Sequence, residues 1–262
     1  MGIVDKVGPG VTNLLPGQRV VASFQIACGN CRYCKEKLSS FCDNTNNSSC
    51  VLIFVTLKWQ STLCRLQERL YGQRDAGFFG YSHFTGGFPG GQAEYVRVPK
   101  GSVNLLPIPD SVPDEKALFL SDIIPTSYHC VVDTGVTEGD IVAIWVGQLQ
   151  YLWFVTDTSS YQGLGPIGMC AAQWAELKGA SRIIGIDKVP ERLAFARIKL
   201  GVETLDFTEH KDVPKRLLEM APGGVDVALD CGEPVTDFGH TACTPKFIYA
   251  LRNISRAQVV VA

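Results

Sequence analysis

The chain has 262 residues and a net charge of −2, with 24 basic and 26 acidic side chains mixed along its length. This balance, which includes no basic tract, argues against a nucleic-acid partner. The longest apolar runs, at 51–57 and 151–155, are far too short to cross a bilayer, so no membrane partner is expected. Ten cysteines in so long a chain, with no secretory signal at its start, predict a reducing, cytoplasmic setting.

The first half, residues 1–124, is predicted to be a β-rich domain. Short apolar runs alternate with turn-forming triplets such as "GPG" and "PGQ". The runs that suggest strands are "GIVDKVG" at 2–8, "QRVVASF" at 18–24 and "AEYVRVP" at 93–99.

Four cysteines in this half, Cys28, Cys31, Cys34 and Cys42, follow the spacing C-x2-C-x2-C-x7-C. Thiolates so spaced converge on one tetrahedral ion, and four protein ligands leave no open position for a substrate. The spacing therefore predicts a structural zinc site. The alternatives are four free thiols or two disulfides, which the expected reducing setting disfavours. The other six cysteines are expected to be ordinary buried thiols.

The second half, residues 125–262, is predicted to alternate strands and helices, which is typical of a parallel sheet with crossover helices. Strands are expected at 140–145, 181–187, 201–207 and 225–230, with a further candidate at 257–262. Helices are expected at 165–180, 189–201 and 210–224. In the second helix, Pro190 near the start and Gly201 at the end are matching start and stop signals.

A glycine fingerprint, G-x-G-x-x-G, is formed by Gly163, Gly165 and Gly168. The first glycine gives the turn, the second lets the backbone approach a pyrophosphate, and the third lets helix and strand pack closely. The N-terminus of the helix then faces the phosphates. Because Pro166 and Ile167 lie inside the motif, they are expected to belong to the same cofactor-binding turn.

Asp187 ends the next predicted strand, nineteen residues after Gly168. A carboxylate in this place accepts hydrogen bonds from ribose hydroxyls and repels a 2′-phosphate, which favours NAD over NADP. Lys188 and Arg192 are candidate neighbours of the phosphates or adenine, with solvated charges as the alternative. For the motif as a whole, the alternative is a glycine-rich turn beside an exposed aspartate.

A β-rich half with a four-cysteine lobe, followed by a dinucleotide half, resembles the zinc-containing medium-chain alcohol dehydrogenases. The branch that it resembles most is the formaldehyde-dehydrogenase-like one. The resemblance covers most of residues 1–232 and implies an α/β fold. It further implies that a GroES-like domain, residues 1–124, precedes an incomplete Rossmann-type doubly wound parallel sheet, residues 125–262. The stretches that carry the resemblance are "GIVDKVGPG", "CGNCRYCKEKLSSFC", "GGFPGGQAEYVRVP", "LFLSDIIPTSYH" and "IIGIDKVPERLAFA".

The resemblance also implies a second, catalytic zinc, which polarises the substrate oxygen while a hydride passes to or from the nicotinamide. Asp122, in "LSD", matches one ligand of that zinc; the alternative is a helix N-cap. The other two ligands, a Cys and a His, would lie upstream of Met1, so the chain is expected to be inactive by itself. His129 could share a helical face with Asp122, although the resemblance favours a structural or cofactor-facing role.

Two segments, 51–67 and 146–162, interrupt the resemblance, and the second separates a predicted strand from its glycine fingerprint. Both have seventeen residues, begin with Val and end with Gln. Because Val codons begin with GT and one Gln codon ends with AG, both segments are consistent with translated introns. The alternative is two genuine surface loops, since loop length costs little.

These observations predict, by lineage, a zinc-dependent, NAD-linked oxidoreductase that acts on a small alcohol or aldehyde in its complete form. The alternative is a non-catalytic zinc- and nucleotide-binding fragment, or the product of a mis-spliced gene model. The family usually forms dimers or tetramers, which implies a homo-oligomer. The sequence after residue 232 departs from the family pattern and is expected to leave the sheet incomplete, with an uncovered edge.

Overall fold

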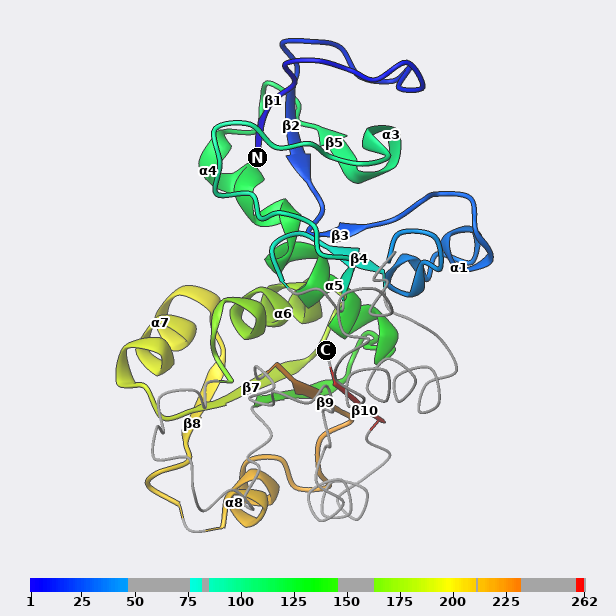
Figure 1. Ribbon diagram of the computed structural model, residues 1–262. Helices are drawn as coiled ribbons and strands as arrows, with labels where there is room; N and C mark the ends of the chain where they lie inside the picture. The colour runs from blue at the N-terminus through cyan, green and yellow to red at the C-terminus, as the bar shows by residue number, and fades with distance from the viewer. Residues whose placement is uncertain (47–75, 82–84, 146–162, 211, 232–257, 262) are drawn as a thin grey trace, which may run out of the picture. The chain divides into compact units, whose positions relative to one another are not determined.

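The computed structural model describes residues 1–46, 76–81, 85–145, 163–210, 212–231 and 258–261 (Figure 1). Two compact units are present, Met1–Asp122 and Ile123–Ala262. The boundary between them lies two residues before the one expected from the sequence. The two interrupting segments, 51–67 and 146–162, lie outside the described residues.

The first unit is built from short strands and short helices. Strands β1 (Gly2–Ile3), β2 (Arg19–Ala22) and β5 (Leu105–Pro107) form an antiparallel sheet in the order β1-β2-β5. Strands β3 (Gln25–Ile26) and β4 (Gly77–Phe78) form a second, antiparallel pair. The helical turns are α1 (Arg32–Lys35), η1 (Ser39–Phe41), α3 (Gly101–Asn104), α4 (Asp114–Ala117) and η3 (Leu118–Ser121).

One predicted strand in this unit is absent. Residues 93–99 are irregular, and 93–97 are exposed to solvent. An alternating run becomes a strand only where one of its faces is buried against a partner, and these residues bury neither face. The apolar pattern alone was therefore misleading here.

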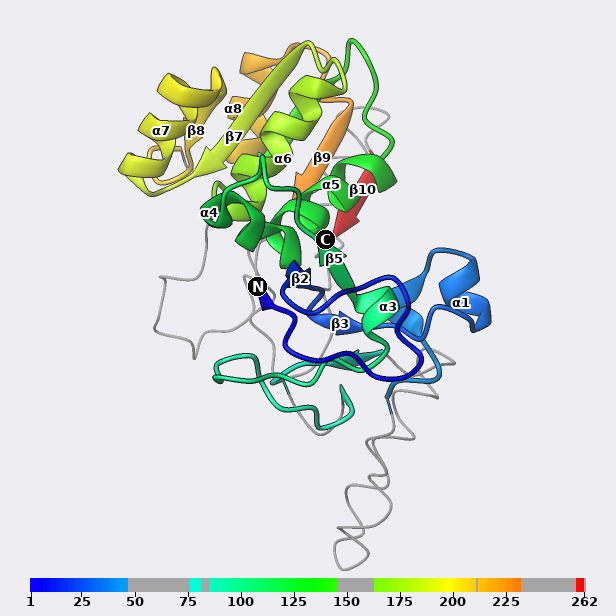
Figure 2. The same cartoon turned by 90° about the horizontal axis from the view of Figure 1, so that it is seen from above.

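The second unit contains a five-stranded parallel sheet in the order β10-β9-β6-β7-β8. The strands are β6 (Ile141–Trp145), β7 (Arg182–Asp187), β8 (Glu203–Asp206), β9 (Val227–Asp230) and β10 (Gln258–Val261). The helices are α5 (Ile123–Asp133), α6 (Pro166–Leu177), α7 (Pro190–Leu200) and α8 (Val213–Met220). The predicted parallel sheet is confirmed, and the fifth candidate strand, β10, pairs with β9 at the sheet edge (Figure 2).

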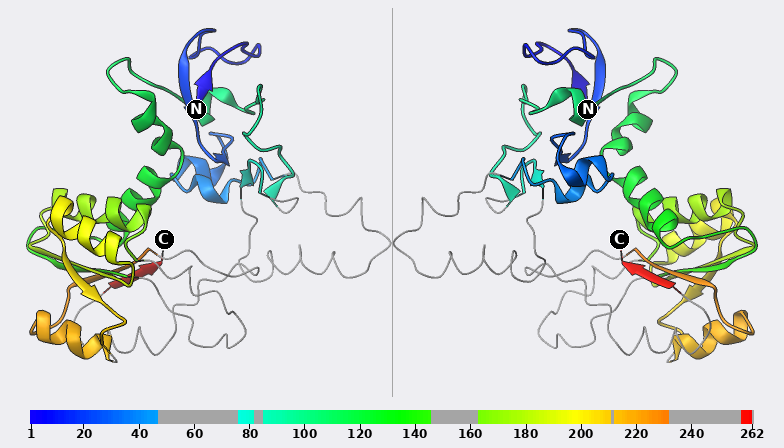
Figure 3. Two further views of the ribbon diagram at one scale, coloured as in Figure 1. Left: turned by 90° about the vertical axis from the view of Figure 1, so that its left-hand side faces the viewer. Right: turned by 90° about the vertical axis from the view of Figure 1, so that its right-hand side faces the viewer.

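Helices cover both faces of this sheet, as a doubly wound fold requires (Figure 3). On one face, Val142 and Ile144 of β6 pack in a core that also contains residues of α5, α6 and α7. On the other face, Ala143 and Trp145 pack in a core that contains Leu217 of α8. Because successive strand residues point to opposite faces, one short apolar strand serves both cores.

The predicted helix signals in this unit also hold. Pro190 is the first residue of α7, and Gly201 ends the helix in the left-handed conformation at φ 65°. Helix α8 is capped by the Asp212 carboxylate, which accepts a hydrogen bond from the Lys215 amide at 3.0 Å. Among the helices that the structure describes, none has the length and hydropathy needed to span a membrane.

Candidate functional site

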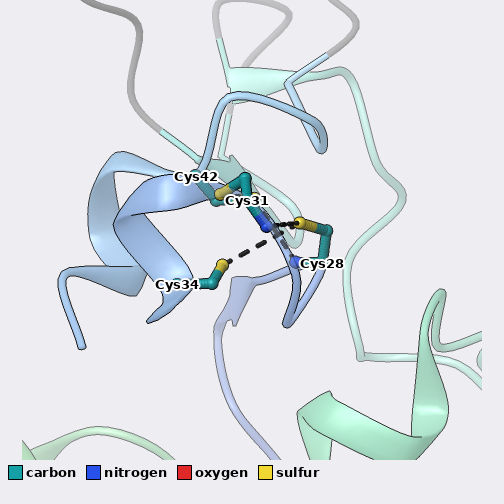
Figure 4. A group of neighbouring side chains, drawn as sticks. All are labelled: Cys28, Cys31, Cys34 and Cys42. Carbon is teal, nitrogen blue, oxygen red and sulfur yellow. Dashed lines mark hydrogen bonds between the residues drawn. The ribbon is translucent and has the colours of Figure 1, made fainter. Parts of the chain in front are cut away.

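The four predicted metal-ligand cysteines come together in the first unit, around α1 (Figure 4). All four sulfur atoms lie within 4.8 Å of one another. Two of the sulfur pairs, Cys28–Cys34 and Cys31–Cys42, are each 3.9 Å apart. Tetrahedral zinc with Zn–S bonds of about 2.3 Å places its sulfur ligands roughly 3.8 Å apart. The donor set and its geometry therefore fit a four-thiolate zinc.

The alternative of two disulfides does not describe this cluster. All four cysteines are free, and the separations of 3.9 Å are almost twice a disulfide bond of about 2.05 Å. Of the six scattered cysteines, Cys130 and Cys231 are buried as expected, whereas Cys170 is only partly buried. The other three lie outside the described residues.

The surroundings of the thiols shift their acidities in opposite directions. Burial raises the pKa of Cys28, but hydrogen bonds from the amides of Asn30 and Cys31 and from the Asn44 side chain outweigh it and lower that pKa to about 6. Burial raises the pKa of Cys34 to about 12. Without metal, one thiol of the cluster is thus already a thiolate near neutral pH, and another must lose its proton when a metal binds.

In the second unit, the predicted fingerprint forms a tightly packed turn between β6 and α6. A Cβ on Gly163 would lie 2.8 Å from the Cα of Trp145, the last residue of β6, and would overlap the Ile186 carbonyl oxygen. A Cβ on Gly168 would overlap the carbonyl oxygen of Gly163. These two positions accept no side chain, which is the close approach expected of the first and third glycines.

Helix α6 starts inside this turn. Gly165 is its N-cap residue, Pro166 is its first residue and is exposed, and Ile167 is partly buried. The amide groups in the first turn of a helix have no partner within the helix, and with the helix dipole they favour an anion. The turn thus presents a backbone cradle for phosphate at the carboxyl end of β6.

Asp187 has a role that the sequence reasoning missed. It is fully buried, and its Oδ2 accepts a hydrogen bond from the Leu164 amide at 2.8 Å. Its Oδ1 accepts from the amides of Lys188 and Val189 at 2.6 and 2.9 Å. The carboxylate therefore fixes the glycine turn to the end of β7. The sequence signal that could have indicated this role was an acidic residue at the end of a strand, close to a turn whose backbone amides need acceptors.

Arg192, the remaining predicted cofactor neighbour, lies in the first turn of α7 and is partly buried. Its Nη1 atom is buried and has no hydrogen-bond partner among the residues that the structure describes. A buried guanidinium nitrogen without a partner is costly. This orphaned donor and the side-chain-free cradle both fit an anionic dinucleotide.

Among the residues that the structure describes, the predicted catalytic ligand Asp122 is not grouped with further metal ligands. It is exposed and lies between η3 and α5, at φ −153° and ψ −69°. Nε2 of His129, the residue considered as a substitute ligand, lies 3.1 Å from Oδ2 of Asp133 on the same helix. Within the described parts of the chain, the four cysteines are the only group of three or more candidate metal ligands.

Comparison with known proteins adds two family matches. The alcohol dehydrogenase GroES-like domain matches residues 1–110, and the zinc-binding dehydrogenase family matches residues 166–237. The first matched range contains the cysteine cluster, and the second begins inside the glycine turn and contains Gly168 and Asp187.

Individual relatives agree with these matches. A zinc-type alcohol dehydrogenase-like protein of Schizosaccharomyces pombe is 40% identical over 229 residues, which are 87% of this chain and 46% of the relative. A glutathione-independent formaldehyde dehydrogenase of Pseudomonas aeruginosa is 32% identical, over 92% of this chain and 51% of the relative. The solved alcohol dehydrogenase of Thermus sp. ATN1 is 27% identical with a TM-score of 0.70, over 100% of this chain and 60% of that one. The chain thus spans about half the length of the curated relatives that it matches.

Proposed function

Because the chain belongs to the zinc-containing medium-chain alcohol dehydrogenase family, we propose that residues 1–262 carry the structural-zinc lobe and the NAD-binding half of an alcohol or aldehyde dehydrogenase. The complete enzyme would move a hydride between a small alcohol or hydrated aldehyde and nicotinamide. Relatives named formaldehyde dehydrogenases favour a small aldehyde as the substrate class.

The glycine turn is the single observation that carries this proposal. Gly163 and Gly168 leave room only for backbone, and the N-terminus of α6 begins between them. A pyrophosphate would accept hydrogen bonds from the backbone amides of this turn. Arg192 would supply a positive charge nearby. The chemistry supplied by NAD is hydride transfer, and the part of this chain is to bind and orient the cofactor.

The preference for NAD is a finer part of the proposal, and it depends on Asp187. The side chain is fully buried, and both of its oxygens already accept amide hydrogens. A carboxylate has about four acceptor sites, so the proposal requires that NAD binding bring a ribose hydroxyl to one of the remaining sites. The same buried negative charge disfavours a 2′-phosphate at the end of β7.

The zinc proposed for the four cysteines is structural, since a complete shell of protein ligands leaves no place for substrate. In the complete enzyme, a catalytic zinc would supply Lewis-acid polarisation of the substrate oxygen. Asp122 is the residue proposed to hold it here. Since Asp122 is not grouped with two further ligands in the described part of the chain, we propose that the 262-residue chain binds one zinc and does not turn over substrate.

A second candidate function is a non-catalytic zinc- and nucleotide-binding chain. It is supported by the grouping of the four cysteines and by the tight glycine turn, since the described residues bring no further metal ligands to Asp122. Alcohol-dependent reduction of NAD by a longer form of the protein that supplies the two other catalytic ligands would support the first candidate over the second.

An NADH fluorescence titration tests the nucleotide site directly. The wild-type chain is expected to bind NADH, whereas Gly168→Val is expected to lose at least tenfold in affinity, because a side chain cannot fit against the Gly163 carbonyl. Gly8→Ala is the matched control, since a Cβ at that position would meet no atom within 4 Å. A folded wild-type chain that shows no NADH binding would contradict the proposal.

A further inference from the structure

Asn104, the last residue of α3, is a buried polar side chain that lies beside the metal centre without being a ligand. It is 4% exposed. Its Oδ1 accepts a hydrogen bond from the Ala27 amide at 2.8 Å, and its Nδ2 donates to the Ala27 carbonyl at 2.9 Å. Nδ2 also donates to the Pro99 carbonyl at 2.9 Å. The side-chain amide therefore pairs with both backbone groups of Ala27, as a neighbouring strand would.

The backbone of Asn104 fixes the other end of the same segment. Its carbonyl accepts a hydrogen bond from the Ser23 amide at 3.1 Å. Strand β3 lies between Ser23 and Ala27, and its Ile26 is completely buried. One residue thus anchors the strand that leads into the first cysteine of the cluster at both of its ends.

The Ala27 carbonyl shares a planar peptide group with the amide of Cys28. Nδ2 of Asn104 fixes the direction of the carbonyl, so it also fixes the direction of the N–H on the other side of the plane. That N–H donates to the sulfur of Cys42 at 3.3 Å. A hydrogen bond from Asn104 at one edge of the peptide plane thus aims a donor at a metal-ligand sulfur at the other edge.

Val103, the residue before Asn104 on α3, lies against Gly29 in the turn that follows Cys28. Gly29 has φ 78°, and a Cβ on it would lie 2.7 Å from Cγ2 of Val103. The turn between Cys28 and Cys31 is therefore covered closely by α3. Both contacts place this short helix against the first half of the cysteine cluster.

We infer that Asn104 is a positioning residue of the metal centre, which sets the Ala27–Cys28 peptide plane and so directs an N–H···S hydrogen bond onto Cys42. This inference rests on the proposed structural zinc. The Cys28 N–H is the outer-shell partner of the Cys42 sulfur, and Asn104 acts through it. Such partners orient a ligand and tune it, and the loss of one typically costs about 10- to 100-fold in metal affinity.

The test compares Asn104→Asp with Asn13→Asp in the full chain. Asn104→Asp keeps the side-chain shape but replaces the donor with an acceptor that faces the Ala27 and Pro99 carbonyls. Asn13 is the matched control, because its Nδ2 also donates to a carbonyl of α3, that of Ser102 at 3.0 Å, but it is exposed. The readouts are the rate of zinc transfer to a chromogenic chelator and the sulfur-to-cobalt charge-transfer bands of the cobalt-substituted chain.

Asn104→Asp is expected to release zinc at least tenfold faster than wild type and to shift the charge-transfer bands, whereas Asn13→Asp should match wild type in both. If Asn104→Asp does not fold, Asn104→Ser removes the amide without adding a charge and carries the same expectation. Wild-type release and an unshifted cobalt spectrum in the Asn104 variant would overturn the inference. A wild-type chain without zinc would instead refute the metal site itself.

Discussion

Deleting residues 146–162 tests whether this segment belongs to the nucleotide-binding unit. The residues on either side of it, Trp145 and Gly163, already lie against each other. A Cβ on Gly163 would be 2.8 Å from the Trp145 Cα, so the two Cα atoms are at most about 4.3 Å apart, close to the roughly 3.8 Å that a trans peptide bond imposes. A direct bond between them therefore requires little movement of β6 or of the turn.

The magnitude follows from loop entropy. Replacing a seventeen-residue connection with a direct bond removes a closure cost of up to ~2.5 kcal/mol. We expect the deletion to raise the free energy of unfolding by up to that amount in a urea titration. NADH affinity should stay within about threefold of wild type, because the turn that would bind the pyrophosphate is already assembled.

Loss of folding or of NADH binding in the deleted chain would refute this reasoning and make residues 146–162 part of the domain. Deletion of 51–67, a segment of equal length in the other unit, is the matched control and should leave NADH affinity unchanged. The underlying hypothesis of translated introns has its own test in transcript reads across both junctions. If every read retains both segments, that hypothesis is wrong.

Two further predictions concern charge. The Glu203 carboxylate accepts hydrogen bonds from Nε and Nη2 of Arg182 at 2.7 and 2.8 Å, and because the pair is partly exposed, Glu203→Gln should destabilise the chain by only about 0.5–1 kcal/mol at pH 7. The hydrogen bond to Arg182 lowers the pKa of Glu203 from 4.5, so the stability difference between wild type and Glu203→Gln should vanish as the pH falls below 4.5 and through the lowered value. A stability difference that persists in acid would show that packing, and not the charge, causes it. At pH 7.5, calorimetry in two buffers should show that zinc binding releases fewer than four protons. The reason is that Cys28, with a pKa of about 6, has already lost its proton. Cys34, with a pKa of about 12, still carries its proton and releases it when zinc binds. A release of four protons would contradict the acidities of the cluster.

The features that could be predicted from the sequence were those with local causes. The spacing of the four cysteines is short, so the loop that carries them determines where their sulfurs meet. Pro190 and Gly201 act on the backbone at their own positions, and they begin and end α7 as expected. The central strands of the parallel sheet are buried on both faces, so they could be recognised in the sequence as short continuous apolar runs.

The features that could not be predicted depend on partners distant in the sequence. Asp187 is buried and accepts a hydrogen bond from Leu164, twenty-three residues away, and Asn104 pairs with Ala27 across seventy-seven residues. Residues 93–99 carry an apolar pattern but meet no sheet. Spacing and composition do not predict these long-range contacts, or the lack of a sheet partner for residues 93–99, because both depend on how the rest of the chain folds.

The most direct test of the central claim is zinc content per purified chain, measured together with alcohol-dependent reduction of NAD. We predict one zinc per chain and no turnover. The zinc should remain in Asp122→Ala and be lost or released much faster in Cys42→Ser, since only the second residue belongs to the cysteine cluster. Two zinc ions per chain with turnover, or a zinc that is lost in Asp122→Ala, would contradict the account.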